Sequence, residues 1–487
     1  MRIFDRIHQK LNWSRRQYLG LIFGLLAVGY LSSAIYHVVK PIPEGLNYTG
    51  KLRHAELRFF ADQTYLDQQG VQHQDHQIFA EILNLIDQAQ NTIVIDMFLF
   101  NKEVGASKAK HEPLTQQLTD ALVAKKQANP AIEIKLITDP INSVYGGVAP
   151  SHYREMRKVG IDVIETDLTP LRASNPLWSG FWYLCCQNSG NNAERGWLPN
   201  PFGNEKITLR SYLTLFNFKA NHRKTVVVDS PEGWKALITS MNPHDGSSRH
   251  SNVAVVVTGR TALDVLKTEQ VVGQMSGANM PGVVAGEFES KSSDPQVQVL
   301  TEKAILDGVL NVIDTAKAED QIDLAMFYLS ERKIIGALKE ANERGVKLRV
   351  LLDPNKDAFG RQKNGIPNRP VASELHDAGI DVRWCRTQGE QCHTKMLIKQ
   401  SGQTTEMIMG SANFTARNLK NYNLETDFRI VGATSAPVLI DAQQYFDAAW
   451  TNQNGRSMSV DYEYYADPSV IKYAMYRFME WSGLATF

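Results

Sequence analysis

The strongest constraint on the fold is that one order of structural elements is written twice along the chain. Residues 77–101 predict an amphipathic helix followed by an apolar strand at 92–100, and residues 301–329 repeat that order with a strand at 322–328. A repeat determines the whole architecture, so it outweighs any single motif. The chain of 487 residues has room for about two to four domains, which accommodates two copies.

The repeat continues through a second strand and a second helix. Residues 132–140 and 346–354 are short apolar strands that both end in Asp-Pro, and a helix then closes on Gly-Ile-Asp-Val at 160–163 and 379–382. Strands that alternate with helices predict an α/β protein. Two copies predict two pseudo-symmetric half-domains, each a mixed β-sheet flanked by helices, with a shared site at their seam.

Each copy then carries a His-x-Lys tripeptide, although the connection to it differs in length. Gly160 to His222 is 62 residues and Gly379 to His393 is 14, so the first copy contains an insertion of about 48 residues. Ser-x-Asn begins 18 residues after each histidine. The first set comprises His222, Lys224, Ser240 and Asn242, and the second comprises His393, Lys395, Ser411 and Asn413.

Two such sets facing one another fit the cleavage of a phosphodiester. Ammonium groups with Ser and Asn donors neutralise its non-bridging oxygens. One neutral imidazole attacks phosphorus to give a phosphohistidine, and a second imidazolium protonates the leaving alkoxide and later activates water. This division of an in-line displacement into two steps requires neither a metal nor a cofactor.

The two motifs, their Ser-x-Asn followers and the duplicated halves resemble the phospholipase D superfamily, in which H-x-K-x4-D occurs twice. The resemblance covers roughly residues 45–455. The segments at 353–356 and 389–393 are similar to bacterial phospholipase D-like and cardiolipin synthase-like enzymes. The resemblance implies that His222 is the nucleophile and His393 the general acid and base, or the reverse, because pseudo-symmetry relates them.

The remaining predicted site residues follow from this resemblance. Lys224, Lys395, Asn242 and Asn413 are expected to hold the phosphate, assisted by Ser240 and Ser411. Asp229 completes the first motif and is expected to organise it, whereas Gln400 stands where the second motif has Asp. Glu425 is expected to reach across and orient His222, and its counterpart, about Asn252, is not an acid. The alternative is that Glu425 is an exposed charge on a strand and does not contact His222.

A charge-free segment near the N-terminus predicts a membrane anchor. From Tyr18 to Val39, 22 residues include no Lys, Arg, Asp or Glu, enough at about 1.5 Å per residue to cross a core of about 30 Å. Basic residues within 1–17 place that segment in the cytoplasm. The predicted location is a bacterial inner membrane with the catalytic body in the periplasm or outside. The alternatives are a cleaved signal peptide, which would make the protein secreted, and a buried core helix.

Two further segments allow two interpretations each. The insertion, about residues 170–219, is rich in aromatic residues and predicts either a lid or lipid-entry wall beside His222 or a loop with its own small core. The tail, residues 456–487, predicts a helix capped by Asp467, and its apolar face is expected to pack on the body rather than on a bilayer. That face comprises Val470, Ile471, Ala474, Met475, Phe478, Met479 and Ser482.

The four cysteines, Cys185, Cys186, Cys385 and Cys392, allow three pairings. Bridges between the 185/186 pair and the 385/392 pair are one interpretation, and four reduced thiols are the other. Zinc is not expected, since no Cys-x2-Cys accompanies suitably spaced histidines. His244 and His250 follow the first motif without spaced partners, which is typical of surface histidines. Tyr328 is expected in the core, and a place on the wall of the pocket is the alternative.

The sequence therefore predicts two halves, 45–285 and 290–455, that act on a glycerophospholipid, the protein being active as a monomer. Water as acceptor gives phosphatidic acid and the head-group alcohol, whereas an alcohol acceptor gives a transferred lipid, as in cardiolipin synthases. Lys plus Arg equal Asp plus Glu at 52 each, so no overall basic field favours nucleic acid. A nuclease and a non-catalytic lipid-binding protein remain the other hypotheses.

Overall fold

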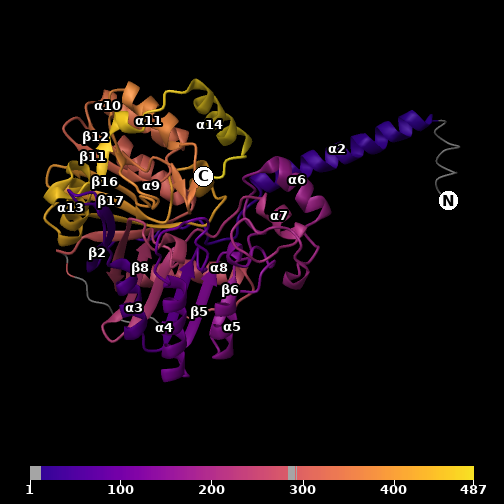
Figure 1. The fold of residues 1–487 in the computed structure, drawn as a ribbon, viewed down its shortest axis with the longest axis horizontal. Helices are drawn as coiled ribbons and strands as arrows, with labels where there is room; N and C mark the ends of the chain where they lie inside the picture. The colour runs from indigo at the N-terminus through magenta and orange to yellow at the C-terminus, as the bar shows by residue number, and fades with distance from the viewer. Residues whose placement is uncertain (1–12, 283–290, 292) are drawn as a thin grey trace.

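The computed structural model describes residues 13–282, 291 and 293–487, which form two large β-sheets covered by helices (Figure 1). The basic residues Arg2, Arg6 and Lys10 lie outside the described part. One sheet has eight strands in the order β3-β2-β9-β8-β7-β4-β5-β6. These strands are β2 (Leu57–Leu66), β3 (Gln72–Asp75), β4 (Thr92–Met97), β5 (Glu133–Thr138), β6 (Asp162–Glu165), β7 (Lys224–Ser230), β8 (Gly233–Thr239) and β9 (Asn252–Thr258).

The other sheet has nine strands in the order β1-β10-β18-β17-β16-β11-β12-β15-β19. They are β1 (Arg53–His54), β10 (Gln296–Thr301), β11 (Gln321–Met326), β12 (Lys347–Leu352), β15 (Asp381–Cys385), β16 (Lys395–Ser401), β17 (Thr404–Gly410), β18 (Thr426–Ala433) and β19 (Ser459–Asp461). A small hairpin, β13 (Asp357–Ala358) and β14 (Arg361–Gln362), lies apart from both sheets.

Six strands of each sheet have the same order and the same directions. Strands β4, β5 and β6 are parallel and β7, β8 and β9 antiparallel, as are β11, β12 and β15 and then β16, β17 and β18. The α/β class and the two sheets are thus confirmed. The first strand ends at Met97 instead of Phe100, because Phe98 and Leu99 leave the sheet to line a cavity.

Helices cover the outer face of each sheet and fill the space between them. The outer helices are α3 (Ile78–Gln88), α4 (Leu114–Ala128) and α5 (Ser151–Lys158) on one sheet, and α9 (Lys303–Asp314), α10 (Arg332–Glu343) and α11 (Asn368–Asp377) on the other. Between the sheets lie α8 (Arg260–Met275) and α13 (Pro437–Thr451). Each packs on the opposite sheet as well as on its own, α8 against β10 and α13 against β2, so one apolar core joins the two sheets.

The N-terminal helix α2 (Arg15–Val39) projects away from the body (Figure 1). Among its residues only Ala34 is buried. It is the one helix of the described ranges long and apolar enough to cross a membrane. Its inner end contacts the insertion, which forms α6 (Pro176–Cys185) and α7 (Leu209–Leu215).

The C-terminal helix α14 (Val470–Ser482) differs from its prediction in two respects. Ser469 caps it, since its Oγ accepts from the Lys472 N–H at 3.3 Å, and Asp467 instead pairs with the Lys472 ammonium. The expected packing of the apolar face was wrong, because Ile471, Met475 and Phe478 are exposed and Tyr476 is the buried contact. A short helix, α12 (Ala416–Leu419), precedes β18.

A buried ion cluster fixes the junction between the sheets. Arg223, between the two residues of the first motif, is fully buried and binds Glu302 at 2.7 Å, with Glu269 of α8 at 3.5 Å. Glu302 Oε1 also accepts from the backbone N–H of Glu425 at 3.2 Å. One guanidinium therefore holds β7, α8 and the start of the second sheet together.

Replacing Arg223 by Met is expected to destabilise the fold by about 3–5 kcal/mol, because removal of one partner leaves buried carboxylates uncompensated. The free energy of unfolding in urea measures the loss. Arg383→Met is the control, since Arg383 pairs with the exposed Asp461 at 2.5 Å and its loss is expected to change stability by less than about 1 kcal/mol. Equal effects of the two substitutions would contradict the assignment.

Candidate active site

The two His-x-Lys motifs lie where the sheets meet, each held by backbone from the opposite sheet. The N–H of His222 donates to the Leu424 carbonyl at 2.9 Å, and the N–H of His393 donates to the Ser251 carbonyl at 2.8 Å. Both strands begin at the lysine, so each histidine stands just before its strand. The two contacts are reciprocal and bring the histidines to a common region.

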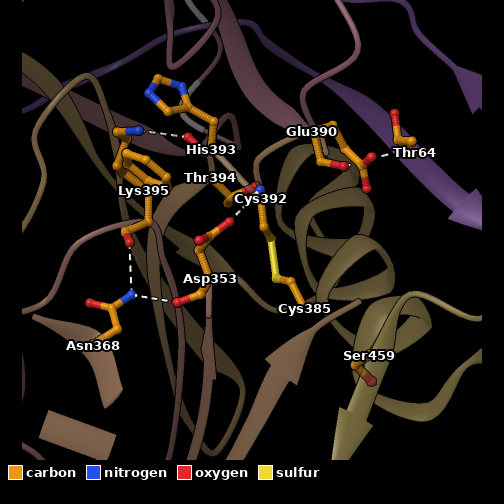
Figure 2. The surroundings of a disulfide bond; sticks show 12 residues. Thr64, Asp353, Asn368, Cys385, Glu390, Cys392, His393, Thr394, Lys395 and Ser459 are labelled. Carbon is orange, nitrogen blue, oxygen red and sulfur yellow. Dashed lines mark hydrogen bonds between the residues drawn. A yellow bond between two sulfur atoms is a disulfide. The ribbon is translucent and has the colours of Figure 1, made fainter. Parts of the chain in front are cut away.

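The repeated Asp-Pro dipeptides support these loops, a role that the sequence did not reveal. Asp139 Oδ2 accepts from the Asn221 N–H at 2.6 Å, and Asp353 Oδ2 accepts from the Cys392 N–H at 2.8 Å. Figure 2 shows Asp353 below the backbone of Cys392, next to His393. Both carboxylates are buried and hold the residue before the histidine. The repetition of Asp-Pro at the same place in each copy was the available signal.

A cavity of about 530 Å³ opens between the sheets and is lined by His222, His393, Asn242 and Asn413. Its apolar wall includes Phe98, Leu99, Ile141, Phe202, Phe327 and Phe359. The structure therefore brings both predicted histidines and both predicted asparagines to one cavity. The insertion contributes Pro201 and Phe202 to the cavity wall. Other residues of the insertion, Trp182 and Ile207, are buried within the insertion itself.

Glu425 on the second sheet contacts His222 on the first. The Nδ1–H of His222 donates to Glu425 Oε2 at 2.9 Å, and Ser411 Oγ donates to the same oxygen at 2.5 Å. Asn418 donates to the other oxygen. Burial raises the pKa of Glu425, while Lys224 and these donors oppose that shift. Because Nδ1 of His222 carries the proton, its Nε2 lone pair is left for the cavity.

His393 has a different partner at the corresponding nitrogen. Its Nδ1 lies 2.9 Å from the Ser240 carbonyl and 3.2 Å from Asn252 Oδ1, both of them acceptors. A carbonyl fixes the ring orientation without adding a negative charge. The two imidazoles are thus held by opposite halves, His222 by a carboxylate and His393 by neutral oxygens.

Burial and neighbouring cations lower the pKa of both histidines well below the usual value. For His222 the cations are Lys224, Lys395 and Arg417, and for His393 Lys395 has the largest effect among them. Burial also lowers the pKa of Lys224 to about 7 and that of Lys395 well below its usual range. These shifts identify a buried place where cationic groups are crowded together, although Glu425 and Asp427 oppose the shift of both lysines.

Among the described residues, the hydrogen bonds of the two ammonium groups go only to carbonyl oxygens of their own motifs. Lys224 Nζ donates to the His222 carbonyl at 2.6 Å and Lys395 Nζ to the His393 carbonyl at 2.8 Å. Each also lies over an aromatic ring, Phe98 at 5.1 Å and Phe327 at 4.9 Å. Within the described part of the chain neither forms an ion pair, so a phosphate would supply the missing charge.

The polar residues after each motif divide into two kinds. Asn413 lines the cavity, and its Oδ1 has no partner among the described residues. Asn242 lines it too, and its Oδ1 accepts from the Leu99 N–H at 3.3 Å. Ser240 and Ser411 instead bind neighbouring strand residues, Ser411 through Glu425. The asparagines are therefore placed to contact a ligand, and the serines support the histidine partners.

Asp229 lies away from this cavity. Its carboxylate accepts from the backbone N–H groups of Asn91 at 2.9 Å and Thr92 at 2.7 Å, at the start of β4. Lys224 lies at the other end of β7, so the contacts of Asp229 join β7 to the start of β4 at the end of the strand far from the cavity. Gln400, its counterpart, donates to Gln443 at 3.0 Å.

Three residues that were expected outside the site line the cavity. His244 and His250 are buried, and Tyr328 lies on the cavity wall. The backbone N–H of Gln391 donates to His250 Nδ1 at 3.2 Å, so Nε2 carries the proton of the neutral ring. That Nε2–H has no partner within the described ranges. No sequence spacing revealed this, because the loop 242–250 is folded toward His393 only by tertiary contacts.

The disulfides join cysteines within each pair, Cys185 with Cys186 and Cys385 with Cys392, so the expectation of bridges between the pairs and that of reduced thiols were both wrong. The 385–392 bridge ties the end of β15 to the residue before His393 (Figure 2). At the corresponding positions of the first half, Asn221 Nδ2 donates to Thr166 Oγ1 at 2.9 Å. A covalent bond and a hydrogen bond therefore perform the same positioning. Within the described residues no group of three His, Cys, Asp or Glu side chains is arranged to hold a metal.

Known proteins match this chain in sequence and in fold. A family model described as "Cardiolipin synthase, PLD-like domain" matches residues 309–450. A protein named phospholipase D, from Rickettsia conorii (strain ATCC VR-613 / Malish 7), is 35% identical over 119 residues, 23% of this chain and 52% of that protein. The chain thus spans about half the length of that curated relative.

Two solved structures are also similar. Phosphatidylserine synthase from Haemophilus influenzae Rd KW20 has a TM-score of 0.55 and 10% identity, over 92% of this chain and 97% of that chain. A phospholipase D family member, Nuc from Salmonella typhimurium, has a TM-score of 0.27 and 25% identity, over 34% and 98%. The match at 309–450 and the partial identity to phospholipase D make this chain similar to phospholipase D-like proteins, in agreement with its His-x-Lys motifs.

Proposed function

We propose that the protein is a phospholipase D-type phosphodiesterase that cleaves glycerophospholipids through a phosphohistidine at His222, releasing phosphatidic acid and the head-group alcohol. The observation that carries this is the hydrogen bond from His222 Nδ1 to Glu425. It leaves Nε2 of His222 with a free lone pair, in a cavity that His222 lines together with His393. In this proposal residues 45–285 and 290–455 are two pseudo-symmetric halves, and the site lies at their seam. The matched strand orders support it.

In the first step His222 Nε2 attacks phosphorus and the bond to the head-group oxygen breaks. That oxygen takes the proton of His393 Nε2, because the Ser240 carbonyl holds the other ring nitrogen as N–H. Lys224, Lys395, Asn242 and Asn413 bind the non-bridging oxygens. The carboxylate of Glu425 stabilises the positive charge that forms on the His222 ring, which favours His222 over His393 as nucleophile.

In the second step His393, now neutral, takes a proton from water, whose oxygen attacks phosphorus as the bond to His222 breaks. The products are phosphatidic acid and free His222. A hydroxyl of glycerol or phosphatidylglycerol in place of water would give a new phosphodiester by the same route. The cardiolipin synthase description of the matching family model supports this phosphatidyl transfer as the second candidate.

The cavity and the N-terminal helix support a lipid substrate rather than a nucleic acid. Aromatic and aliphatic side chains form much of the cavity wall, which suits acyl chains. In this proposal α2 anchors the protein in a bilayer, with Arg15 and Arg16 at the cytoplasmic end and the body outside.

The products decide between hydrolase and transferase. Purified protein is incubated with mixed phospholipids, with and without glycerol, and the lipids are identified by mass. We expect phosphatidic acid without glycerol, and a glycerol-bearing lipid with it if transfer occurs. Cleavage of DNA without phospholipid turnover would contradict the proposal.

The position of the covalent intermediate is tested with His393→Asn and a phosphatidyl ester of p-nitrophenol. This leaving group needs no general acid, so the first step proceeds, whereas the second lacks its base. We expect a phosphatidyl group to accumulate on His222, found by mass spectrometry of its peptide. His222→Asn is the matched control and should accumulate none. A modified His393 in that control would reverse the assignment.

The pH dependence follows from the lowered pKa of both histidines. In the free enzyme His222 must be neutral and His393 protonated, so kcat/KM is expected to have its optimum below pH 6.5. A bound phosphate anion favours the imidazolium, so the alkaline limb of kcat should lie at higher pH than that of kcat/KM. Coincident limbs above pH 7 would exclude these protonation states.

His250 is expected to donate its free Nε2–H to the substrate. His250→Ala should lower kcat/KM by roughly tenfold, the loss of one hydrogen bond of about 1.4 kcal/mol, and His250→Gln should restore part of it through its amide donor. His73→Gln, on the exposed strand β3, is the control and should leave kcat/KM unchanged. Equal losses in the Ala and Gln variants would contradict a donor role.

A further inference from the structure

Helix α6 of the insertion packs along the inner end of α2. Tyr30 Oη donates to the Leu177 carbonyl at 2.8 Å, and the rings of His37 and Tyr183 stack at 3.6 Å. Between these contacts Ala34 meets Gly180 so closely that a Cβ on Gly180 would lie 2.8 Å from that of Ala34. Close crossing at small residues is typical of helices that associate within membranes.

The length of α2 sets the level of this crossing. Arg15 and Arg16 mark one membrane interface, and from Arg16 to Tyr30 the helix rises only about 21 Å. A hydrocarbon core of about 30 Å therefore extends beyond Tyr30, to about Tyr36. The crossing of Ala34 with Gly180 then lies inside the far leaflet, so α6 is at membrane depth whenever α2 spans.

The outer face of α6 has the chemistry that this depth requires. Leu177, Phe181 and Leu184 form a stripe at helical spacing with exposed fractions of 59%, 47% and 59%. Residues 173–193 contain no Lys, Arg, Asp or Glu. The net charge and composition of the whole chain are ordinary. An exposed apolar stripe on a charge-free helix is therefore unusual for a surface that faces water, and it indicates an interaction surface.

Helix α14 continues this surface. Gly483 at its end contacts the Ser174 carbonyl just before α6, and a hollow of about 210 Å³ is lined jointly by Val38, Pro176 and Trp481. Trp481 is 82% exposed, and Phe478 is exposed one turn earlier. In Figure 1, α6, α14 and the inner end of α2 lie on one side of the molecule, whereas β2 lies on the other.

We propose that α6 and the outward face of α14 dock into the outer leaflet of the bilayer that holds α2, so that the enzyme takes its phospholipid from that leaflet. This deepens the proposed function and rests on it. The same segments lead to the site: Phe202 of the insertion and Phe487 after α14 line the catalytic cavity, and Arg417 lines both the cavity and the hollow.

Docking is tested apart from catalysis. The full-length protein is reconstituted in vesicles of phosphatidylcholine and phosphatidylglycerol with or without brominated acyl chains. Bromine lowers the fluorescence of nearby tryptophans. The loss measured for wild type minus the loss measured for Trp481→Phe reports the quenching of Trp481 alone. We expect bromine to quench at least half of the Trp481 fluorescence. An equal loss of fluorescence to bromine in wild type and in Trp481→Phe would overturn docking, whether or not any lipid is hydrolysed.

The source of the substrate is tested with two vesicle populations, one containing the protein and one protein-free with isotopically heavy acyl chains. Light product comes from the vesicles that contain the protein, and heavy product comes from the protein-free vesicles. We expect at least tenfold more light than heavy product. Equal amounts would overturn uptake from the anchoring membrane. Phe181→Glu combined with Trp481→Glu should lower light product at least tenfold while leaving turnover of soluble bis(p-nitrophenyl) phosphate within twofold. Val71→Glu, at an exposed apolar residue in the β2–β3 turn, should change neither.

A wild-type protein that is quenched by bromine but turns over no phospholipid would overturn the proposed function and leave docking in place. A wild type that hydrolyses light and heavy lipid equally, and whose Trp481 is not quenched by bromine, would overturn docking and leave the proposed function in place. An unchanged light product in the double Glu variant would also overturn the role of α6 and α14.

Discussion

The structure depends on two reciprocal backbone contacts between the sheets. His222 donates its backbone N–H to the carbonyl of Leu424 and His393 donates to that of Ser251, and each contact stands beside the residue that holds the same histidine's imidazole. Glu425 follows Leu424, and Asn252 follows Ser251. Because each histidine is oriented by residues of the opposite sheet's side, neither sheet alone carries the whole of the proposed site. The ion cluster around Arg223 and the crossed packing of α8 and α13 keep those contacts in register.

This arrangement has an electrostatic consequence. Burying Lys224 and Lys395 beside two imidazoles concentrates positive charge where water is scarce, which is unfavourable until an anion enters. The lowered pKa values of these four groups express the same unfavourable burial. In the proposed function, such a preorganised cationic cavity would act on a phosphodiester without rearranging at the moment of reaction, and preorganisation of this kind is the main source of stabilisation in such sites.

Different residues hold the segment before each histidine in the two copies of the repeat. In the first half a hydrogen bond from Asn221 to Thr166 secures the residue before the histidine, and in the second half the Cys385–Cys392 disulfide does so. The carboxylate of Glu425 is matched by the amide of Asn252. These substitutions make the halves chemically unequal, and that inequality assigns different proposed roles to His222 and His393.

The sequence by itself determined the α/β class, the repeated succession of strands and helices along the chain and both His-x-Lys motifs, because the repeat sets hydrophobic periodicity and spacing locally. The family resemblance, rather than the pattern alone, indicated Glu425 as the partner of His222. Only the tertiary structure decided the disulfide pairing, the entry of His244 and His250 into the cavity, and the outward face of α14. Those features depend on which segments meet in space, and loop paths and helix orientations follow from packing between distant residues rather than from local pattern.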